Sequence, residues 1–129
     1  GTGSGILGLA AAKLGAKSVI MTDIDPVAVE AANRNAKLNK VDGVCKAMLT
    51  NLLDGIVGAG DIVVANITAE VLAFLVKDIR SYVKAGGVVI LSGILNDRLE
   101  KVVKAYEAAG LKTQEMLTDG EWSAAVFKA

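Results

Sequence analysis

Histidine is absent from this sequence, and cysteine, proline and tryptophan occur once each. Without histidine the chain holds neither a Ser-His-Asp triad nor a histidine-ligated zinc site, and a single Cys45 rules out a cysteine-rich metal site. Cys45 has no partner for an internal disulfide, which fits a reducing, cytoplasmic setting. We therefore expect chemistry that uses no metal.

Long apolar runs and an excess of either charge are also lacking. No run approaches the roughly 20 residues of a membrane-spanning helix, and there is no signal-peptide pattern, so no membrane partner is expected. Lys and Arg number 14, as do Asp and Glu, which argues against a broad basic surface for nucleic acid. Hydrophobic residues make up 53%, which is ample for the core of one domain spanning 1–129.

Helical and strand patterns alternate along the chain, which predicts an α/β fold with a mostly parallel sheet and helices on both faces. Strand 61–66 contains a continuous apolar run, 62–65, that is mostly β-branched, as expected of a strand buried on both faces. The chain ends in an expected antiparallel β-hairpin, 111–117 and 121–127. The other expected elements are a helix at 5–14 ended by Gly15, strands at 18–22, 44–49 and 88–91, and helices capped by Asp25 (with Pro26 first), by Thr68 (reaching Val83) and by Asn96 (closed by Gly110).

A glycine-rich turn leads directly into the first helix. Gly3, Gly5 and Gly8 satisfy the spacing G-x-G-x-x-G, and an acid, Asp23, lies 20 residues beyond Gly3. Such a loop lets a ligand approach the backbone at a helix N-terminus, and the acid accepts from ribose hydroxyls. Asp23 could instead be a helix cap or a solvated loop acid, but Asp25 already fills the cap position. These residues indicate an adenosine-containing ligand, and the same four would serve an NAD-dependent oxidoreductase.

A second polar group follows the strongest strand. Asn66 heads the stretch Asn66-Ile67-Thr68-Ala69, where its amide oxygen can accept a hydrogen bond from an incoming amine. The alternative is that Asn66 caps the next helix, since asparagine is a favoured cap. The terminal hairpin favours a methyltransferase over a second dinucleotide-binding half.

Four stretches, 1–7, 22–31, 63–69 and 91–95, together resemble the class I S-adenosylmethionine-dependent methyltransferases. Within that class the pair Asn-Ile-x-Ala and Ser-Gly-Ile-Leu most resembles the bacterial family that methylates the eleventh protein of the large ribosomal subunit. The resemblance implies a Rossmann-like class I methyltransferase sheet. It also implies S-adenosylmethionine as cofactor, S-adenosylhomocysteine as product and no metal.

The resemblance also implies roles for particular residues. Gly1, Thr2 and Gly3 would bind the cofactor, with the two glycines approaching its methionine part. Asp23 would bind the ribose hydroxyls, Ile24 would pack on the adenine, Asn51 would accept from the adenine amino group, and Asn66 would border both methyl donor and acceptor. Thr68 departs from the leucine usual in the family, and Trp122 matches it. The implied reaction is methyl transfer to a protein amine, either a lysine side chain or an N-terminal amine. Replacing Asn66 by alanine should lower turnover far more than cofactor affinity.

In the family's sheet the strand before Gly1 is central, so we expect this chain to be truncated at its N-terminus. The missing strand would leave two unpaired edges about 10 Å apart, because neighbouring strands lie about 4.8 Å apart. Such edges recruit other strands, which makes chain–chain pairing an expected possibility. The family also has an N-terminal domain that recognises the ribosomal protein, absent here, so a catalytically inactive fragment is the further alternative.

Overall fold

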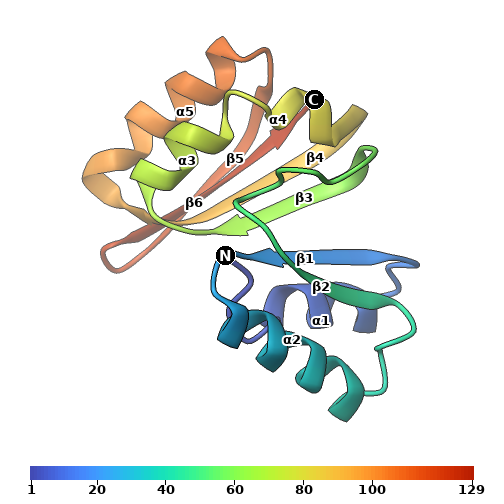
Figure 1. Cartoon of the computed structure of the whole chain (residues 1–129). Helices are drawn as coiled ribbons and strands as arrows, with labels where there is room; N and C mark the ends of the chain where they lie inside the picture. The colour runs from blue at the N-terminus through green and yellow to red at the C-terminus, as the bar shows by residue number, and fades with distance from the viewer. The chain divides into compact units, whose positions relative to one another are not determined.

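The computed structural model describes residues 1–129, and the chain divides into two compact units, Gly1–Ile56 and Val57–Ala129. Each unit has its own sheet, of two and of four strands. Figure 1 colours the first unit blue to green and the second green to red. The units are described separately, and the single domain predicted from the sequence stays a prediction.

The first unit alternates helices and strands in the predicted order. Its elements are α1 (Ile6–Lys13), β1 (Val19–Asp23), α2 (Pro26–Leu38) and β2 (Cys45–Leu49). The two strands are parallel, with Val19 opposite Cys45 and Asp23 opposite Leu49. Both helices lie on the same side of these strands (Figure 1).

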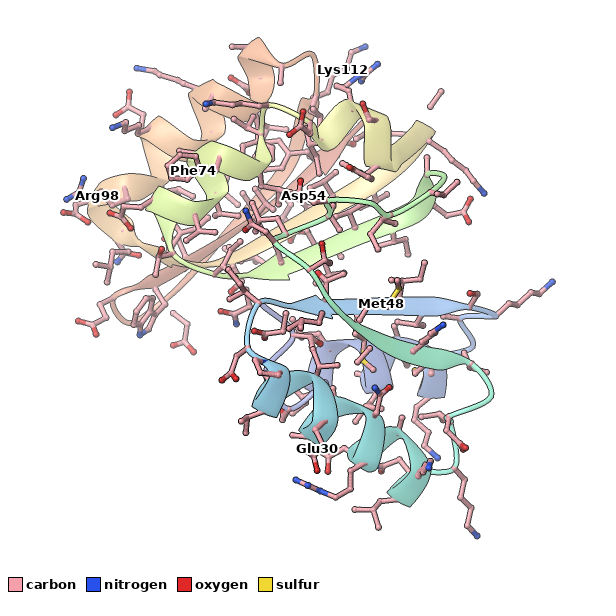
Figure 2. All side chains as sticks on the ribbon, in the orientation of Figure 1. Glu30, Met48, Asp54, Phe74, Arg98 and Lys112 are labelled. Atoms are coloured by element: carbon pink, nitrogen blue, oxygen red, sulfur yellow. The ribbon has the colours of Figure 1, made fainter.

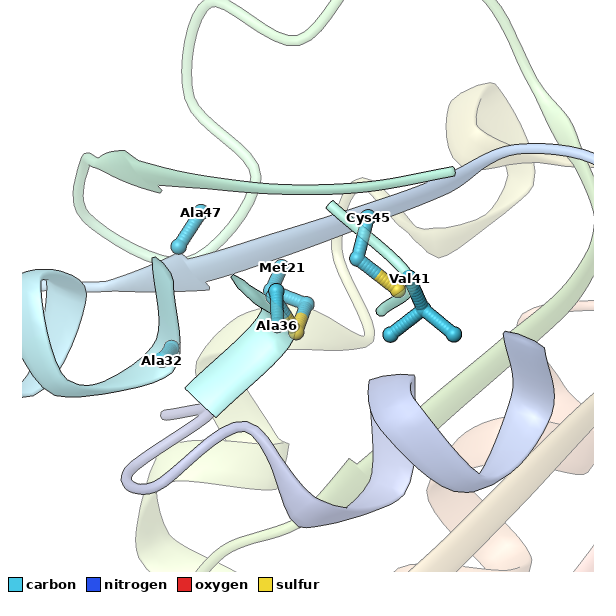
Figure 3. Packing of buried hydrophobic residues seen from close by; sticks show 6 residues of the cluster. All are labelled: Met21, Ala32, Ala36, Val41, Cys45 and Ala47. Atoms are coloured by element: carbon cyan, nitrogen blue, oxygen red, sulfur yellow. The ribbon is translucent and has the colours of Figure 1, made fainter. Parts of the chain in front are cut away.

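Small side chains let the first unit pack tightly. Its core consists of buried residues from β1, α2, β2 and the segment joining the last two (Figure 3). Ala32 and Ala36 of α2 are fully buried, which brings the helix backbone close to the strands. The core residues are Met21, Ala32, Ala36, Val41, Cys45 and Ala47.

Local sequence signals explain where these helices begin and end. The Asp25 side chain accepts from the Val27 N–H at 2.9 Å and Pro26 is the first residue of α2, as predicted. Gly15 lies just beyond α1 with φ 105°, in the left-handed region where glycine carries no steric cost. The predicted cap and stop are therefore both confirmed.

The second unit has one four-stranded sheet and several short helices. Its elements are β3 (Gly60–Asn66), α3 (Ala69–Leu75), α4 (Ile79–Tyr82), β4 (Val83–Leu95), the 3-10 turn η1 (Asn96–Arg98), α5 (Leu99–Ala108), β5 (Lys112–Asp119) and β6 (Trp122–Lys128). The strand order is β3-β4-β6-β5, with β3 and β4 parallel and the other pairs antiparallel. The predicted terminal hairpin is confirmed as β5 and β6.

Helices α3 and α5 cover one face of this sheet (Figure 1). Tyr106 of α5 stacks on Phe127 of β6 with ring centroids 5.4 Å apart, and both are fully buried. The Tyr106 hydroxyl donates to the Leu72 carbonyl at 3.1 Å, tying α5 to α3. By contrast Phe74, on the outer side of α3, is 63% exposed (Figure 2).

Two predictions about this sheet are wrong. Strand β3 is not buried on both faces: Ile62 is 61% and Val64 43% exposed. The reason is that β3 is an edge strand paired only with β4, and the unit's helices cover one face of its sheet. The expected strand 88–91 begins earlier, at Val83, which pairs with Gly60 before the register jumps to Ile62 opposite Val88.

The helix expected from Thr68 to Val83 is also divided in two. It ends at Leu75 and resumes at Ile79, because Lys77 and Asp78 donate to carbonyls three residues back, in tight turns. Val83 then joins β4. The segment nevertheless turns one apolar side to the core, since Leu72, Leu75, Ile79 and Val83 are buried.

Neither predicted side-chain cap in this unit forms. Thr68 precedes α3 but makes no capping hydrogen bond. Asn96 instead donates to the Gly120 carbonyl at 2.9 Å and accepts from the Ser123 hydroxyl at 2.6 Å, so its amide holds the hairpin turn. Helix α5 begins only at Leu99, after the 3-10 turn.

Candidate functional site

The glycine-rich loop lies against the carboxyl end of β1. The nitrogens of Gly1 and Thr2 both donate to the Thr22 carbonyl, at 2.6 and 2.8 Å. The Gly5 N–H donates to the Thr2 carbonyl at 2.9 Å, which closes the turn before α1. Backbone hydrogen bonds therefore fix the loop on the last residues of the strand.

The three glycines of the fingerprint meet different surroundings. A Cβ added at Gly8 would lie 2.5 Å from the Met21 sulfur, so this glycine allows α1 to pack on β1. At Gly5, with φ 88°, an added Cβ would lie 3.1 Å from the Ala32 Cβ of α2. Gly3, with φ 56°, has nothing within 4 Å of an added Cβ. Only Gly3 faces open space, where a ligand can approach the backbone.

Asp23 is the charged group of this loop. Its two carboxylate oxygens accept from the backbone N–H groups of Gly3 at 2.9 Å and Asp25 at 3.0 Å. Burial raises the pKa of this carboxyl, but these two N–H groups, the Gly1 amino group and the Ile24 N–H outweigh burial and hold it below its usual value. Asp23 is therefore ionised near neutral pH although only 8% of the residue is exposed.

The ionised carboxylate keeps accepting capacity for a ligand. Each oxygen has two lone pairs, and each receives one backbone N–H, so one lone pair on each remains for a further donor. The Gly1 nitrogen lies 3.7 Å from the nearer oxygen, so the carboxylate points at the glycine-rich loop. Two adjacent hydroxyls are the donors that such a pair of oxygens fits.

The two other predicted residues of this unit lie beside Asp23. Ile24 follows it directly and is 71% exposed, so it presents an apolar surface at the end of β1. The Thr50 N–H donates to the Asp23 carbonyl at 3.0 Å, which places the exposed Asn51 just beyond the neighbouring strand end. The unit thus gathers Gly1, Thr2, Gly3, Asp23, Ile24 and Asn51 at the carboxyl ends of β1 and β2.

Asn66 belongs to the second unit. It is the last residue of β3, pairs with Ser92 of β4 and is exposed. A Cβ added at Gly93 would lie 2.6 Å from the Asn66 Oδ1. The role implied for Asn66 by the family resemblance, beside both methyl donor and acceptor, stays a prediction. Gly93 is a residue that the sequence reasoning missed, although its Ser-Gly-Ile-Leu stretch was singled out as a family signature.

No helix has the length and apolar character needed to cross a membrane, and no group of three or more His, Cys, Asp or Glu is placed to hold a metal ion. The single Cys45 is buried, and burial raises the pKa of its thiol.

The fold is that of the class I methyltransferases: α/β, with a mixed sheet and an antiparallel C-terminal hairpin. The chain resembles the crystal structure of ribosomal protein L11 methylase from Lactobacillus delbrueckii subsp. bulgaricus with a TM-score of 0.95 and 39% identity, over 98% of this chain and 66% of that one. A methyltransferase from Pyrococcus furiosus, 20% identical, shares the fold with a TM-score of 0.84 over 99% of this chain and 71% of that one.

The family can be stated more closely. The family model described as "Ribosomal protein L11 methyltransferase (PrmA)" matches residues 1–129, and the chain belongs to this family. Ribosomal protein L11 methyltransferase of Clostridium perfringens (strain SM101 / Type A) is 46% identical over 99% of this chain. The chain spans 41% of the length of that relative.

Proposed function

We propose that this chain carries out S-adenosylmethionine-dependent methyl transfer to amino groups of the large-subunit ribosomal protein L11. Family membership supports the reaction and the substrate. The observation that carries the proposal is the ionised Asp23, held by the Gly3 and Asp25 N–H groups with accepting capacity left on both oxygens. The proposed partner is the ribosomal protein, and the proposed location is the cytoplasm.

The residues of the first unit fit the proposed cofactor. Asp23 would accept from the two ribose hydroxyls, the exposed Ile24 would pack on the adenine, and Asn51 would accept from the adenine amino group. Open space at Gly3 allows the methionine part to approach the loop, with Gly1 and Thr2 beside it. When bound, S-adenosylmethionine supplies an electrophilic sulfonium methyl group.

Asn66 is the residue we propose for the acceptor. A lysine amine has a pKa of about 10.4 and must lose a proton, here to water, before its lone pair can form the new N–C bond. The Asn66 side-chain oxygen would then accept an N–H of the neutral amine and orient it in line with the breaking C–S bond. Holding donor and acceptor together in line lowers a barrier by up to about 7–11 kcal/mol in all, and the Asn66 hydrogen bond would supply one part of that effect.

The oxidoreductase alternative finds no support in the comparisons. Hydride transfer would use the same Gly3, Gly5, Gly8 and Asp23, so a binding experiment separates the two functions. Titration calorimetry of this chain is expected to detect S-adenosylhomocysteine and not NAD. Binding of NAD alone would contradict the proposal, and binding of neither would mean that these residues do not form a cofactor site by themselves.

A pair of variants tests the role of Asp23. Asp23→Asn removes the charge from the hydrogen bonds to the ribose, and since such bonds contribute about 1.5–3 kcal/mol, the Kd for S-adenosylhomocysteine should rise about 10- to 100-fold. Asp25→Asn is the matched control, because asparagine caps a helix about as well as aspartate. Circular dichroism would first confirm that both variants are folded. Equal losses of affinity in the two variants would remove Asp23 from the site.

A further inference from the structure

We infer that Gly93 is a positioning residue, which sets the orientation of the Asn66 amide toward the acceptor amine. The inference rests on the proposed function and adds a residue to it. It comes from a bulge in β4, opposite β6, where the pairing register shifts between Leu91 and Ile94. Gly93 lies inside this bulge with φ 74°. Glycine at positive φ is the residue that such a bulge requires.

The burial pattern of β4 shows what the bulge does. Residues of a regular strand alternate between faces, and Gly87, Val89 and Leu91 follow that rule by being buried. Ile94 is also fully buried, although it lies three positions after Leu91, an odd step that would place it on the opposite face of a regular strand. The extra residue has therefore shifted the phase of the strand. The shift leaves the Ser92–Gly93 backbone beside the end of β3, where Asn66 pairs with Ser92.

The space next to Gly93 is filled by Asn66 and the residue after it. An added Cβ would lie 2.6 Å from the Asn66 Oδ1, 3.0 Å from the Ile67 carbonyl oxygen and 3.2 Å from the Ile67 nitrogen. A Cα–H of Gly93 therefore points at the amide oxygen. Two of the three neighbours are backbone atoms, and the Ile67 N–H donates to the Ser92 carbonyl at 3.3 Å. A side chain at position 93 would displace the amide rather than the backbone.

Gly93 cannot simply move away, because the chain on both sides of it is held. Leu91 pairs with Ala125 before the bulge, and Ile94 pairs with Ser123 after it. Ser123 is 2% exposed, and its hydroxyl donates to Asn96, whose amide donates to the hairpin turn at Gly120. The hairpin thus holds the bulge in position, and the position of Gly93 in the bulge limits where the Asn66 side-chain oxygen can lie.

The experiment compares Gly93→Ala with Gly86→Ala. Gly86 also lies in β4 with φ 76°, but an added Cβ there meets nothing within 4 Å, so it carries the same backbone strain without the contact. Gly93→Ala should lower kcat for methylation of the ribosomal protein by about 100-fold, as expected for a displaced reacting group, while the Kd for S-adenosylhomocysteine is unchanged. Gly86→Ala should leave both constants at the parent values.

The double variant with Asn66→Ala separates this inference from the proposed function. If Gly93 acts through the amide, Gly93→Ala should have no further effect on kcat once Asn66 has been replaced by alanine. A change of no more than about twofold counts as no effect, because mutational effects add only to about that precision. A full additional loss there, or normal kcat in Gly93→Ala alone, would overturn the inference. Unchanged kcat in Asn66→Ala alone would overturn instead the role proposed for Asn66.

A second measurement applies even if Gly93→Ala does not fold. In the parent protein the Ile67 amide proton should show a nuclear Overhauser effect to a Gly93 Hα, because this Hα points at the Ile67 nitrogen as well as at the Asn66 Oδ1, which carries no proton. The Asn66 side-chain amide protons are assigned by their loss in Asn66→Ala. A folded Gly93→Ala variant should shift these amide resonances, whereas Gly86→Ala should not. The absence of the Gly93 effect in the parent protein would contradict the placement itself.

Discussion

The packing of α1 on β1 can be tested by one methyl group. In Gly8→Ala the new Cβ would lie 2.5 Å from the Met21 sulfur and 2.6 Å from its Cγ. Non-bonded carbon contacts are about 3.5–4.0 Å, so the Met21 side chain must move by more than about 1 Å. Met21 is 3% exposed and belongs to the core cluster with Ala32 and Ala36, which leaves it little room.

Two opposing effects decide the sign of the change. Alanine is favoured over glycine inside a helix by about 1 kcal/mol. Inserting a methylene into a well-packed core costs about 1–3 kcal/mol. Because the clash involves Cγ as well as the mobile sulfur, we expect packing to win, with a net loss of up to about 2 kcal/mol.

The assay must report on the first unit, and Trp122 lies in the second. Native-state hydrogen exchange at the Met21 amide meets this need, and a loss of about 1.4 kcal/mol would appear as roughly tenfold faster exchange. Gly43→Ala is the control, since an added Cβ there meets nothing within 4 Å. Slower exchange in Gly8→Ala would refute the reasoning, because it would show that Met21 moves aside freely.

Two further predictions concern pH and a buried hydroxyl. The Asp23 pKa is lowered in the folded chain, so Asp23 contributes stability that is present above its unfolded pKa near 3.8 and is lost as the pH falls through the folded pKa. Urea titrations from pH 7 downward should therefore show a smaller loss of stability on acidification in Asp23→Asn than in the parent protein. Identical pH profiles of the two proteins would contradict the lowered pKa. Tyr106→Phe removes the hydroxyl donor to the Leu72 carbonyl, which keeps the Val76 N–H, and should cost about 0.5–1.5 kcal/mol in urea unfolding. Tyr82→Phe, at a half-buried position, should cost less, and equal costs would argue against the hydrogen bond.

Much of the fold could be predicted because its signals are local. Asp25 and Pro26 mark a helix start whatever surrounds them, and Gly15 marks a helix end for the same reason. The failures involve partners distant in sequence. Asn96 fits a cap by its type, but the hairpin turn at Gly120 offers its amide a carbonyl 24 residues away. The prediction that β3 is buried on both faces failed for the same reason. The apolar pattern around Ile62 does not show whether its strand lies at the edge or in the middle of a sheet.

In the candidate site too, the residues with local sequence signals could be predicted and those that depend on distant partners could not. Asp23 could be predicted because the fingerprint spacing places an acid at the end of the second strand, and the structure does bring it to the Gly3 N–H. Gly93 could not be predicted in its role. Its importance depends on a register shift against β6 and on the position of Asn66, which lies 27 residues earlier and on another strand.

The hydrogen bonds to Asp23 have a consequence for sequence variation. Both donors to its carboxylate are main-chain N–H groups, so neither depends on the identity of a neighbouring side chain. Residues around the acid can therefore be exchanged over evolutionary time without turning the carboxylate, provided that the path of the backbone is kept. The choice of residue is most restricted at Gly3, because its φ of 56° lies in the left-handed region that favours glycine. In a mutational scan, exchange of Ile24 for other apolar residues should therefore be tolerated, whereas substitution of Gly3 should not.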